Sequence, residues 1–142
     1  MSTAEATSTA ARFRAAVERK DLAAAGELLA PDVVFHSPVT FHPFLGRETV
    51  SRLLGEVIQV FTDFRYTDEL AMDGAHALIF RAGVAGTDRE IEGIDLLRFQ
   101  DGRADGPIVD FTVMLRPLSA LVPFAQQMGE RAQAAGLQTT RA

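Results

Sequence analysis

One carboxylate stands out in the segment REIEGIDLLRF, residues 89–99, which reads as a β-strand. Alternate residues of a strand point to the same side of the sheet. One side of this strand is apolar except for a single carboxylate, and it carries Ile91, Gly93, Asp95, Leu97 and Phe99. The opposite side collects the charged residues, so we expect Asp95 to point into the hydrophobic interior.

The apolar surroundings of Asp95 predict its chemistry. They disfavour the charged form, so its pKa is expected to rise. A protonated aspartate donates a hydrogen bond to a ligand oxygen or serves as a general acid. In the alternative interpretation, a tyrosine, a histidine or backbone groups satisfy Asp95 and the network stabilises the core. The sequence leaves both interpretations open.

Further polar candidates lie in the segment HSPVTFHPF and on a later strand. His36 and His42 are candidates for proton transfer, and we group them with Asp95 as candidate catalytic residues. Ser37 is a candidate ligand contact, and so is Tyr66, the only tyrosine, which is also a possible partner for Asp95. Two histidines six residues apart, with no third ligand at a recognisable spacing, do not predict a metal site.

The apolar walls of the expected pocket come from several segments. Residues 107–115 read as a strand in which Phe111 and Val113 share one face and Asp110 lies on the other. The face with Asp110 is expected to be the convex side of the sheet, where a partner subunit would cover it. The apolar residues expected to contact a ligand are Phe13, Phe35, Leu97, Phe111, Val113 and Leu115.

Several classes of chemistry are excluded by what the sequence lacks. There is no cysteine, which excludes a disulfide scaffold, a thiolate zinc site and a cysteine nucleophile. No GxGxxG, GxxxxGK[ST] or GxSxG motif is present. Any chemistry would therefore be general acid–base work in a pocket, without a cofactor or a metal.

The composition is that of one globular domain. The chain has 142 residues, of which 47% are hydrophobic and 23% charged, and its formal net charge is −5. An acidic chain of this kind is not expected to bind nucleic acid. No apolar run is long enough to span a membrane, and the N-terminus does not read as a signal peptide, so we expect a cytoplasmic protein without membrane contact.

Periodicity and turn residues predict the elements that would position these side chains. Helices are expected over 9–20, between Asp21 and Pro31, and over 46–61 and 117–135. Strands are expected over 33–35, 63–72, 76–86, 89–100 and 107–115. Asp-Gly turns between the later strands favour antiparallel hairpins. The expected fold class is α+β, a strongly curved antiparallel sheet with helices across its concave side, which encloses a pocket. We expect a disordered leader over 1–8, a single domain over 9–136 and a flexible tail over 137–142.

The order of these features resembles the SnoaL-like, nuclear transport factor 2-like superfamily over roughly residues 10–130. The resemblance rests on the strings LLAPDVVF, SP, FLGRE, DLLRF, DGR and RPL, in this order and spacing. It implies a cone-shaped barrel with three N-terminal helices and one C-terminal helix around an apolar pocket. It also implies a homodimer, here through the convex sheet face. Members include ketosteroid isomerases, polyketide cyclases, limonene-type epoxide hydrolases and non-catalytic binding domains, so the fold does not choose among them.

Ketosteroid isomerase offers a sharper comparison. It has a tyrosine on the first helix, an aspartate base just before a proline, and a protonated aspartate on a strand. When this sequence is aligned with the ketosteroid isomerase pattern, these three positions fall on Phe13, Ser37 and Asp95. A serine without an activating partner does not replace a carboxylate base, so isomerisation by that pattern is not expected.

Two functions therefore stay open for the pocket, which is expected to hold a small hydrophobic molecule. The first is a cofactor-free isomerase, cyclase or hydrolase that uses Asp95. The second is a non-catalytic ligand-binding or dimerisation module of the same fold.

Overall fold

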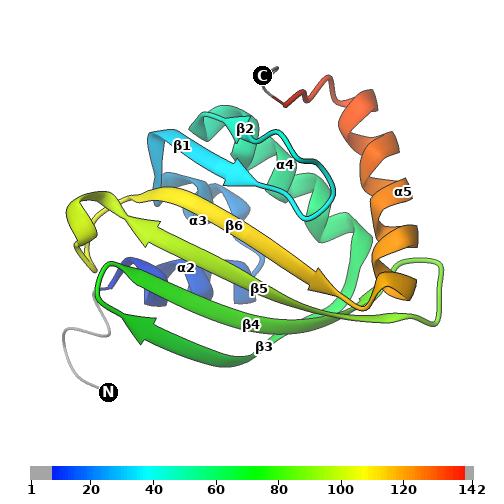
Figure 1. Ribbon diagram of the computed structural model, residues 1–142, viewed down its shortest axis with the longest axis horizontal. Coiled ribbons are helices and arrows are strands. Elements are labelled where there is room, and N and C mark those ends of the chain that lie inside the picture. Colours follow the sequence, from blue (N-terminus) through cyan, green and yellow to red (C-terminus); the bar gives the residue numbers. More distant parts are fainter. Residues whose placement is uncertain (1–7, 140–142) are drawn as a thin grey trace.

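The computed structural model describes residues 8–139, which form four α-helices and six β-strands (Figure 1). The helices are α2 (Thr9–Glu18), α3 (Leu22–Glu27), α4 (Arg47–Val60) and α5 (Leu118–Ala134). The strands are β1 (Leu29–His36), β2 (Phe44–Leu45), β3 (Phe61–Met72), β4 (Ala75–Val84), β5 (Glu90–Phe99) and β6 (Ile108–Arg116), with a 3-10 turn, η1 (Gln100–Gly102). The α+β class is confirmed.

The strands form one curved, open sheet in the order β2-β1-β6-β5-β4-β3. Neighbouring strands are antiparallel except for β1 and β6, which run parallel. The expected sheet was antiparallel throughout. One helix, α4, and four strands, β2 to β5, separate β1 from β6 along the chain, and β6 then returns beside β1 in the parallel direction. Figure 1 shows α2, α3 and α4 behind the sheet, with α5 across one end of it.

Strand β1 is longer than its short β-branched run predicts. It begins at Leu29 and contains Pro31, which was expected to stop the preceding helix. The pairing of β1 with β6 is irregular between Leu29 and Val34, so the proline lies where the regular ladder is interrupted. Proline has no N–H to donate, which makes such an irregularity the place where a strand tolerates it.

Helix caps fix how the N-terminal helices begin. The Ser8 hydroxyl accepts a hydrogen bond from the N–H of Ala11 at the start of α2, and the Asp21 carboxylate accepts one from Ala24 in α3. Ser8, which we expected in the leader, is thus a helix cap, whereas residues 1–7 lie outside the described part. At the other end, Leu137 is buried although it was expected in the tail.

The alternation expected for the strand that carries Asp95 is confirmed. Exposed or half-exposed residues alternate with buried ones along the whole of β5. Asp95 is 6% exposed, and Thr9 is the only other buried polar residue among those described. The curved sheet and the helices therefore enclose a core that contains one carboxyl group.

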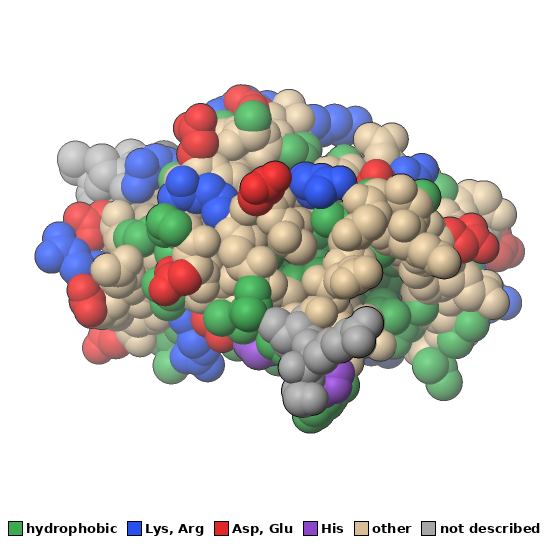
Figure 2. Space-filling view, turned by 90° about the horizontal axis from the view of Figure 1, so that it is seen from above, with side chains coloured by type: hydrophobic (Ala, Val, Ile, Leu, Met, Phe, Trp, Pro, Cys, Tyr) green, Lys and Arg blue, Asp and Glu red, His purple; other side chains and the backbone are tan. Residues whose placement is uncertain are grey.

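The face of the molecule seen in Figure 2 is not uniformly charged. In the view of Figure 2, basic and acidic side chains alternate with scattered apolar ones. Along the residues that the structure covers, no helix is long and apolar enough to cross a membrane. Within the same residues, no cluster of histidine and carboxylate side chains has the arrangement of a metal site.

Candidate functional site

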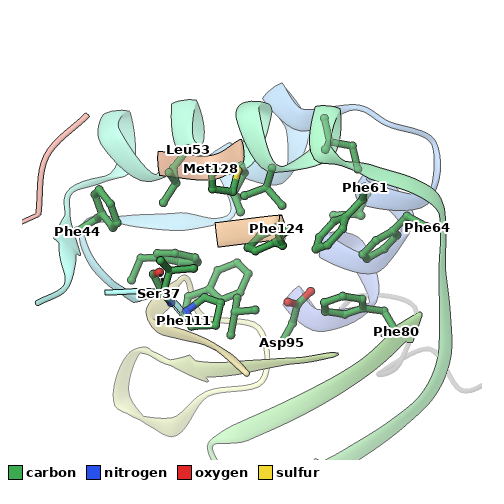
Figure 3. Close-up of a pocket in the computed structure, with 18 of the residues that line it drawn as sticks. Ser37, Phe44, Leu53, Phe61, Phe64, Phe80, Asp95, Phe111, Phe124 and Met128 are labelled. Atoms are coloured by element: carbon green, nitrogen blue, oxygen red, sulfur yellow. Dashed lines mark hydrogen bonds between the residues drawn. The ribbon is translucent and has the colours of Figure 1, made fainter. Parts of the chain in front are cut away.

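A cavity of about 120 Å³ lies between the concave face of the sheet and helices α4 and α5. Aliphatic and aromatic side chains make up almost the whole wall, and all the wall residues labelled in Figure 3 except Ser37 and Asp95 are of these kinds. An apolar cavity of roughly 150 Å³ accommodates benzene in another protein. A ligand seated wholly inside this cavity is therefore about the size of one ring.

Asp95 brings the one carboxyl group into this wall. In Figure 3 its carboxyl points from the sheet toward the helices, beside Phe80 and below Phe124. The hydroxyl of Tyr66, on β3, donates a hydrogen bond of 3.0 Å to Oδ2 of Asp95. Tyr66 was expected as a possible partner, and the structure brings the two together across the intervening strand β4.

The second carboxyl oxygen, Oδ1, faces the cavity. Among the described residues, every buried side-chain nitrogen or oxygen has a hydrogen-bond partner. The one hydrogen bond of the Asp95 side chain uses Oδ2. Oδ1 therefore keeps accessible surface, and this surface belongs to the cavity that Asp95 lines.

Burial governs the acidity of both members of the pair. Removal from water raises the pKa of Asp95 from 3.8 to about 7, against the smaller opposing effect of the hydrogen bond from Tyr66. Burial, followed by the charge of Asp95, raises the pKa of Tyr66 well above its ordinary value of 10.0. Tyr66 consequently stays a hydrogen-bond donor, while Asp95 is both neutral and ionised near pH 7.

Replacing Tyr66 by phenylalanine tests this pair. Oδ2 of Asp95 would lose its partner, which should lower the free energy of unfolding by about 2 kcal/mol. It should also raise the pKa of Asp95 further, because the hydrogen bond from Tyr66 favours the charged form. Chemical denaturation measures the first effect and a carbon-13 NMR titration of the carboxyl measures the second. An unchanged or lowered pKa would show that Tyr66 does not stabilise the carboxylate.

The structure sorts the other residues expected to contact a ligand. The six that line the cavity are Phe13, Phe35, Ser37, Tyr66, Phe111 and Val113. Leu97 is fully buried in the hydrophobic core, and Leu115 packs against that core, but neither lines the cavity. Both residues lie on the expected side of their strands. Whether such a residue lines the cavity therefore depends on which side chains pack over it.

The two histidines lie away from Asp95. Nε2 of His36 is 3.0 Å from Oδ2 of Asp110, and neither residue lines the cavity. β1 continues to His36, and its inward residues are Val33 and Phe35, so alternation turns His36 to the opposite face. His42 lies in the loop before β2 and its ring packs against Phe41. The structure therefore brings neither histidine to the carboxyl group of Asp95.

Much of the wall was not anticipated as a site. Helix α4 supplies Leu53, Leu54, Val57 and Ile58 to the wall, and α5 supplies Phe124 and Met128. Phe61, Phe64 and Phe80 close the end nearest Asp95. One signal was present in the sequence, Gly93 in the middle of β5, because a glycine inside a strand often marks the close approach of another group. In the structure, a Cβ at this position would collide with the Phe80 ring and with Leu115.

The arrangement supports one kind of chemistry. Neutral Asp95 can donate a hydrogen bond, or a proton, from Oδ1 to a ligand oxygen. Ionised Asp95 can accept a proton from a ligand. Ser37, at the position of the isomerase base, lines the cavity, but its Oγ accepts hydrogen bonds from the N–H groups of Val39 and Thr40. No other side chain that titrates is found in the described wall apart from Tyr66.

Comparison with solved structures finds close similarity over nearly the whole chain. A steroid delta-isomerase from Pseudomonas aeruginosa is 38% identical, with 97% of this chain and 98% of that one covered and a TM-score of 0.82. An uncharacterised protein with a cystatin-like fold from Silicibacter pomeroyi is 32% identical, with 90% and 87% covered and a TM-score of 0.81. A protein with a ketosteroid isomerase-like fold from Catenulispora acidiphila, in complex with trimethylamine, is 16% identical, with 83% and 92% covered and a TM-score of 0.61, which shows the fold alone.

The family follows from the sequence as well as from the fold. Among proteins of curated function, no significant match is found. The family model for the SnoaL-like domain matches residues 10–105, from the second residue of α2 through β5, and therefore includes Tyr66 and Asp95. With its curved sheet, its helices and its similarity to structures of the nuclear transport factor 2-like fold, the chain belongs to the SnoaL-like family.

Proposed function

We propose that the chain binds a small, mostly apolar molecule with one carbonyl or hydroxyl oxygen, and that Asp95 exchanges a proton with it. The chain would then act as a cofactor-independent isomerase, cyclase or hydrolase. The observation that carries this proposal is the Asp95 carboxyl, held at Oδ2 by Tyr66 and open to an apolar cavity at Oδ1.

The acidity of this group supports a role in proton transfer. General acid–base catalysis is most effective when the pKa of the catalytic group lies near the working pH. Burial raises the pKa of Asp95 to about 7, so both of its forms are populated in a neutral solution. The similarity to a steroid delta-isomerase favours a ketone as the partner in this exchange.

Ligand binding without turnover is the second candidate, and the composition of the wall favours it. Proton transfer between two atoms of a ligand usually needs one group that removes a proton and another that stabilises the resulting charge. Here Tyr66 already donates to Asp95, and Ser37 has no base beside it in the described wall. Asp95 would then only hold the oxygen of a bound molecule.

A small ketone separates the two candidates. The probe is 3-cyclohexen-1-one, whose single ring matches the cavity volume and whose α-protons exchange when a base removes them. In D₂O at pH 7, the wild-type chain should accelerate this exchange, followed by proton NMR. Asp95→Asn keeps the shape and the hydrogen bond to the ligand but cannot exchange the proton, so the rate should fall on the order of 100-fold.

Asp110→Asn is the matched control, since it makes the same chemical change on the opposite face of the sheet. Its rate should equal that of the wild type. Binding of the ketone without accelerated exchange would exclude the enzyme and leave the binding protein. Failure of 3-cyclohexen-1-one, and of phenol as a second one-ring probe, to bind the wild type would count against both candidates.

A further inference from the structure

A second hollow, of about 420 Å³, lies outside the ligand cavity. Thr40 and Phe44, from the loop before β2 and from β2 itself, line one side of it. Residues of the C-terminal half of α5 and of the segment after it line the other side. This outer hollow is not needed to hold a one-ring molecule.

The outer hollow adjoins the ligand cavity. Thr40, Phe44, Gly129 and Ala132 line both of them. In Figure 3, Phe44 lies at the opposite end of the ligand cavity from Phe80, and Asp95 lies on the side of Phe80. A molecule whose oxygen contacts Asp95 therefore extends toward the outer hollow when it is lengthened.

Gly129 leaves the junction of the two spaces without a side chain. Glycine weakens the interior of a helix relative to alanine, and Gly129 lies within α5. No atom lies within 4 Å of the position that a Cβ would take there, so close packing does not require glycine. Gly129 lines both spaces, and no side chain of its own stands between them.

The outer hollow differs from the ligand cavity in polarity. The residues that line it include four with hydroxyl or amide side chains, Thr40, Gln133, Gln138 and Thr139. No charged side chain is found among the described residues that line it. Hydroxyl and amide groups of this kind suit an uncharged group that forms hydrogen bonds, rather than a carboxylate or a phosphate.

From these observations we infer that the outer hollow is a second subsite, reached past Gly129, for the far end of an elongated neutral ligand. The inference rests on the proposed function, because the near end of that ligand is the oxygen held by Asp95. The ligand class is an elongated, mostly apolar molecule with an oxygen at one end and an uncharged polar group at the other.

A series of 4-alkylphenols tests the subsite, with the phenol ring and hydroxyl as the near end. Kd is measured by calorimetry at pH 6, from phenol to 4-heptylphenol. Each methylene buried on the way to the outer hollow should tighten binding about fourfold. 4-(6-Hydroxyhexyl)phenol has a hydroxyl in place of the terminal methyl group, and it should bind at least as tightly as 4-heptylphenol if that end reaches the polar wall.

Gly129→Leu should fill the border between the two spaces. Because Gly129 also lines the ligand cavity, each Kd in this variant is compared with that of phenol in the same variant, and the gain along the alkyl series should disappear. Gly55→Leu is the matched control, because Gly55 lies inside α4, has open space at its Cβ position and lines neither space. Both variants replace a helical glycine by a better helix former, so thermal unfolding should show both to be folded.

Each result decides between the two proposals. A steep series that flattens in Gly129→Leu but not in Gly55→Leu supports the subsite. A flat series in the wild type, or a steep one that survives in Gly129→Leu, overturns the subsite. The proposed function still stands in that case if the substitution Asp95→Leu abolishes the binding of phenol. If no member of the series binds the wild type, the subsite is overturned, and the proposed function fails with it when 3-cyclohexen-1-one does not bind either.

Discussion

Asp95→Asn should stabilise the chain relative to the wild type, and the gain should grow as the pH rises. Asp95 has an ordinary pKa of 3.8 in the unfolded chain, whereas burial raises its pKa to about 7 in the folded one. Between these two values the folded state binds the extra proton, so the stability of the wild type falls as the pH rises through this window. The stability that the wild type draws from holding Asp95 in its neutral form is fully present below pH 3.8 and is lost above about pH 7.

The size of this effect follows from the shift. About three pKa units correspond to roughly 4 kcal/mol, which is the growth expected in the difference between Asp95→Asn and the wild type from pH 4 to pH 8. Asparagine resembles the neutral carboxyl group: its oxygen can accept the Tyr66 hydroxyl and its amide does not ionise. Urea denaturation at a series of pH values measures both chains, and parallel curves would show that Asp95 is not buried as described.

Phe111→Ala is expected to lower the free energy of unfolding by about 3 kcal/mol. Phe111 is 1% exposed on β6, and its ring makes edge-to-face contacts with Phe13 and Phe35, at centroid distances of 5.5 and 5.1 Å. Truncation of a buried phenylalanine to alanine costs about 3–5 kcal/mol. The low end applies here because part of the ring already borders the cavity and makes no contact on that side.

The same substitution should enlarge the cavity, which gives a second readout. Benzene should restore part of the lost stability in Phe111→Ala and have little effect on Phe111→Leu, the matched variant that keeps more of the side chain. Thermal unfolding with and without benzene measures both. A loss of less than about 1 kcal/mol without any response to benzene would show that the neighbouring rings do not depend on Phe111 for their packing.

The homodimer and the cytoplasmic location, both expected from the sequence, stay predictions. Asp110 and His36 form a polar pair on the outer face of the sheet, where Met114 is half exposed. A homodimer through this face would bury all three residues, and light scattering of the purified chain measures its mass. The cytoplasmic location likewise remains an expectation from the sequence.

The direction of Asp95 was determined by the sequence alone. A strand has a side-chain period of two, so the apolar neighbours of Asp95 place it inward whatever the strand packs against. The same rule, applied one residue further along β1, would have turned His36 outward. The β-branched run, however, ends at Phe35, and His36 joins the strand only through its pairing with Thr112 of β6, far along the chain.

Only the tertiary structure decided which residue holds Asp95 and how large the cavity is. β3 is irregularly paired on both sides of Tyr66, so no count along the sequence gives the position of that hydroxyl relative to β5. The cavity is what remains after side chains from the sheet, α4 and α5 have packed, and each of those side chains would look the same in a filled core. A periodic pattern specifies which face is buried, because that property is local, whereas the space left unfilled depends on every element at once.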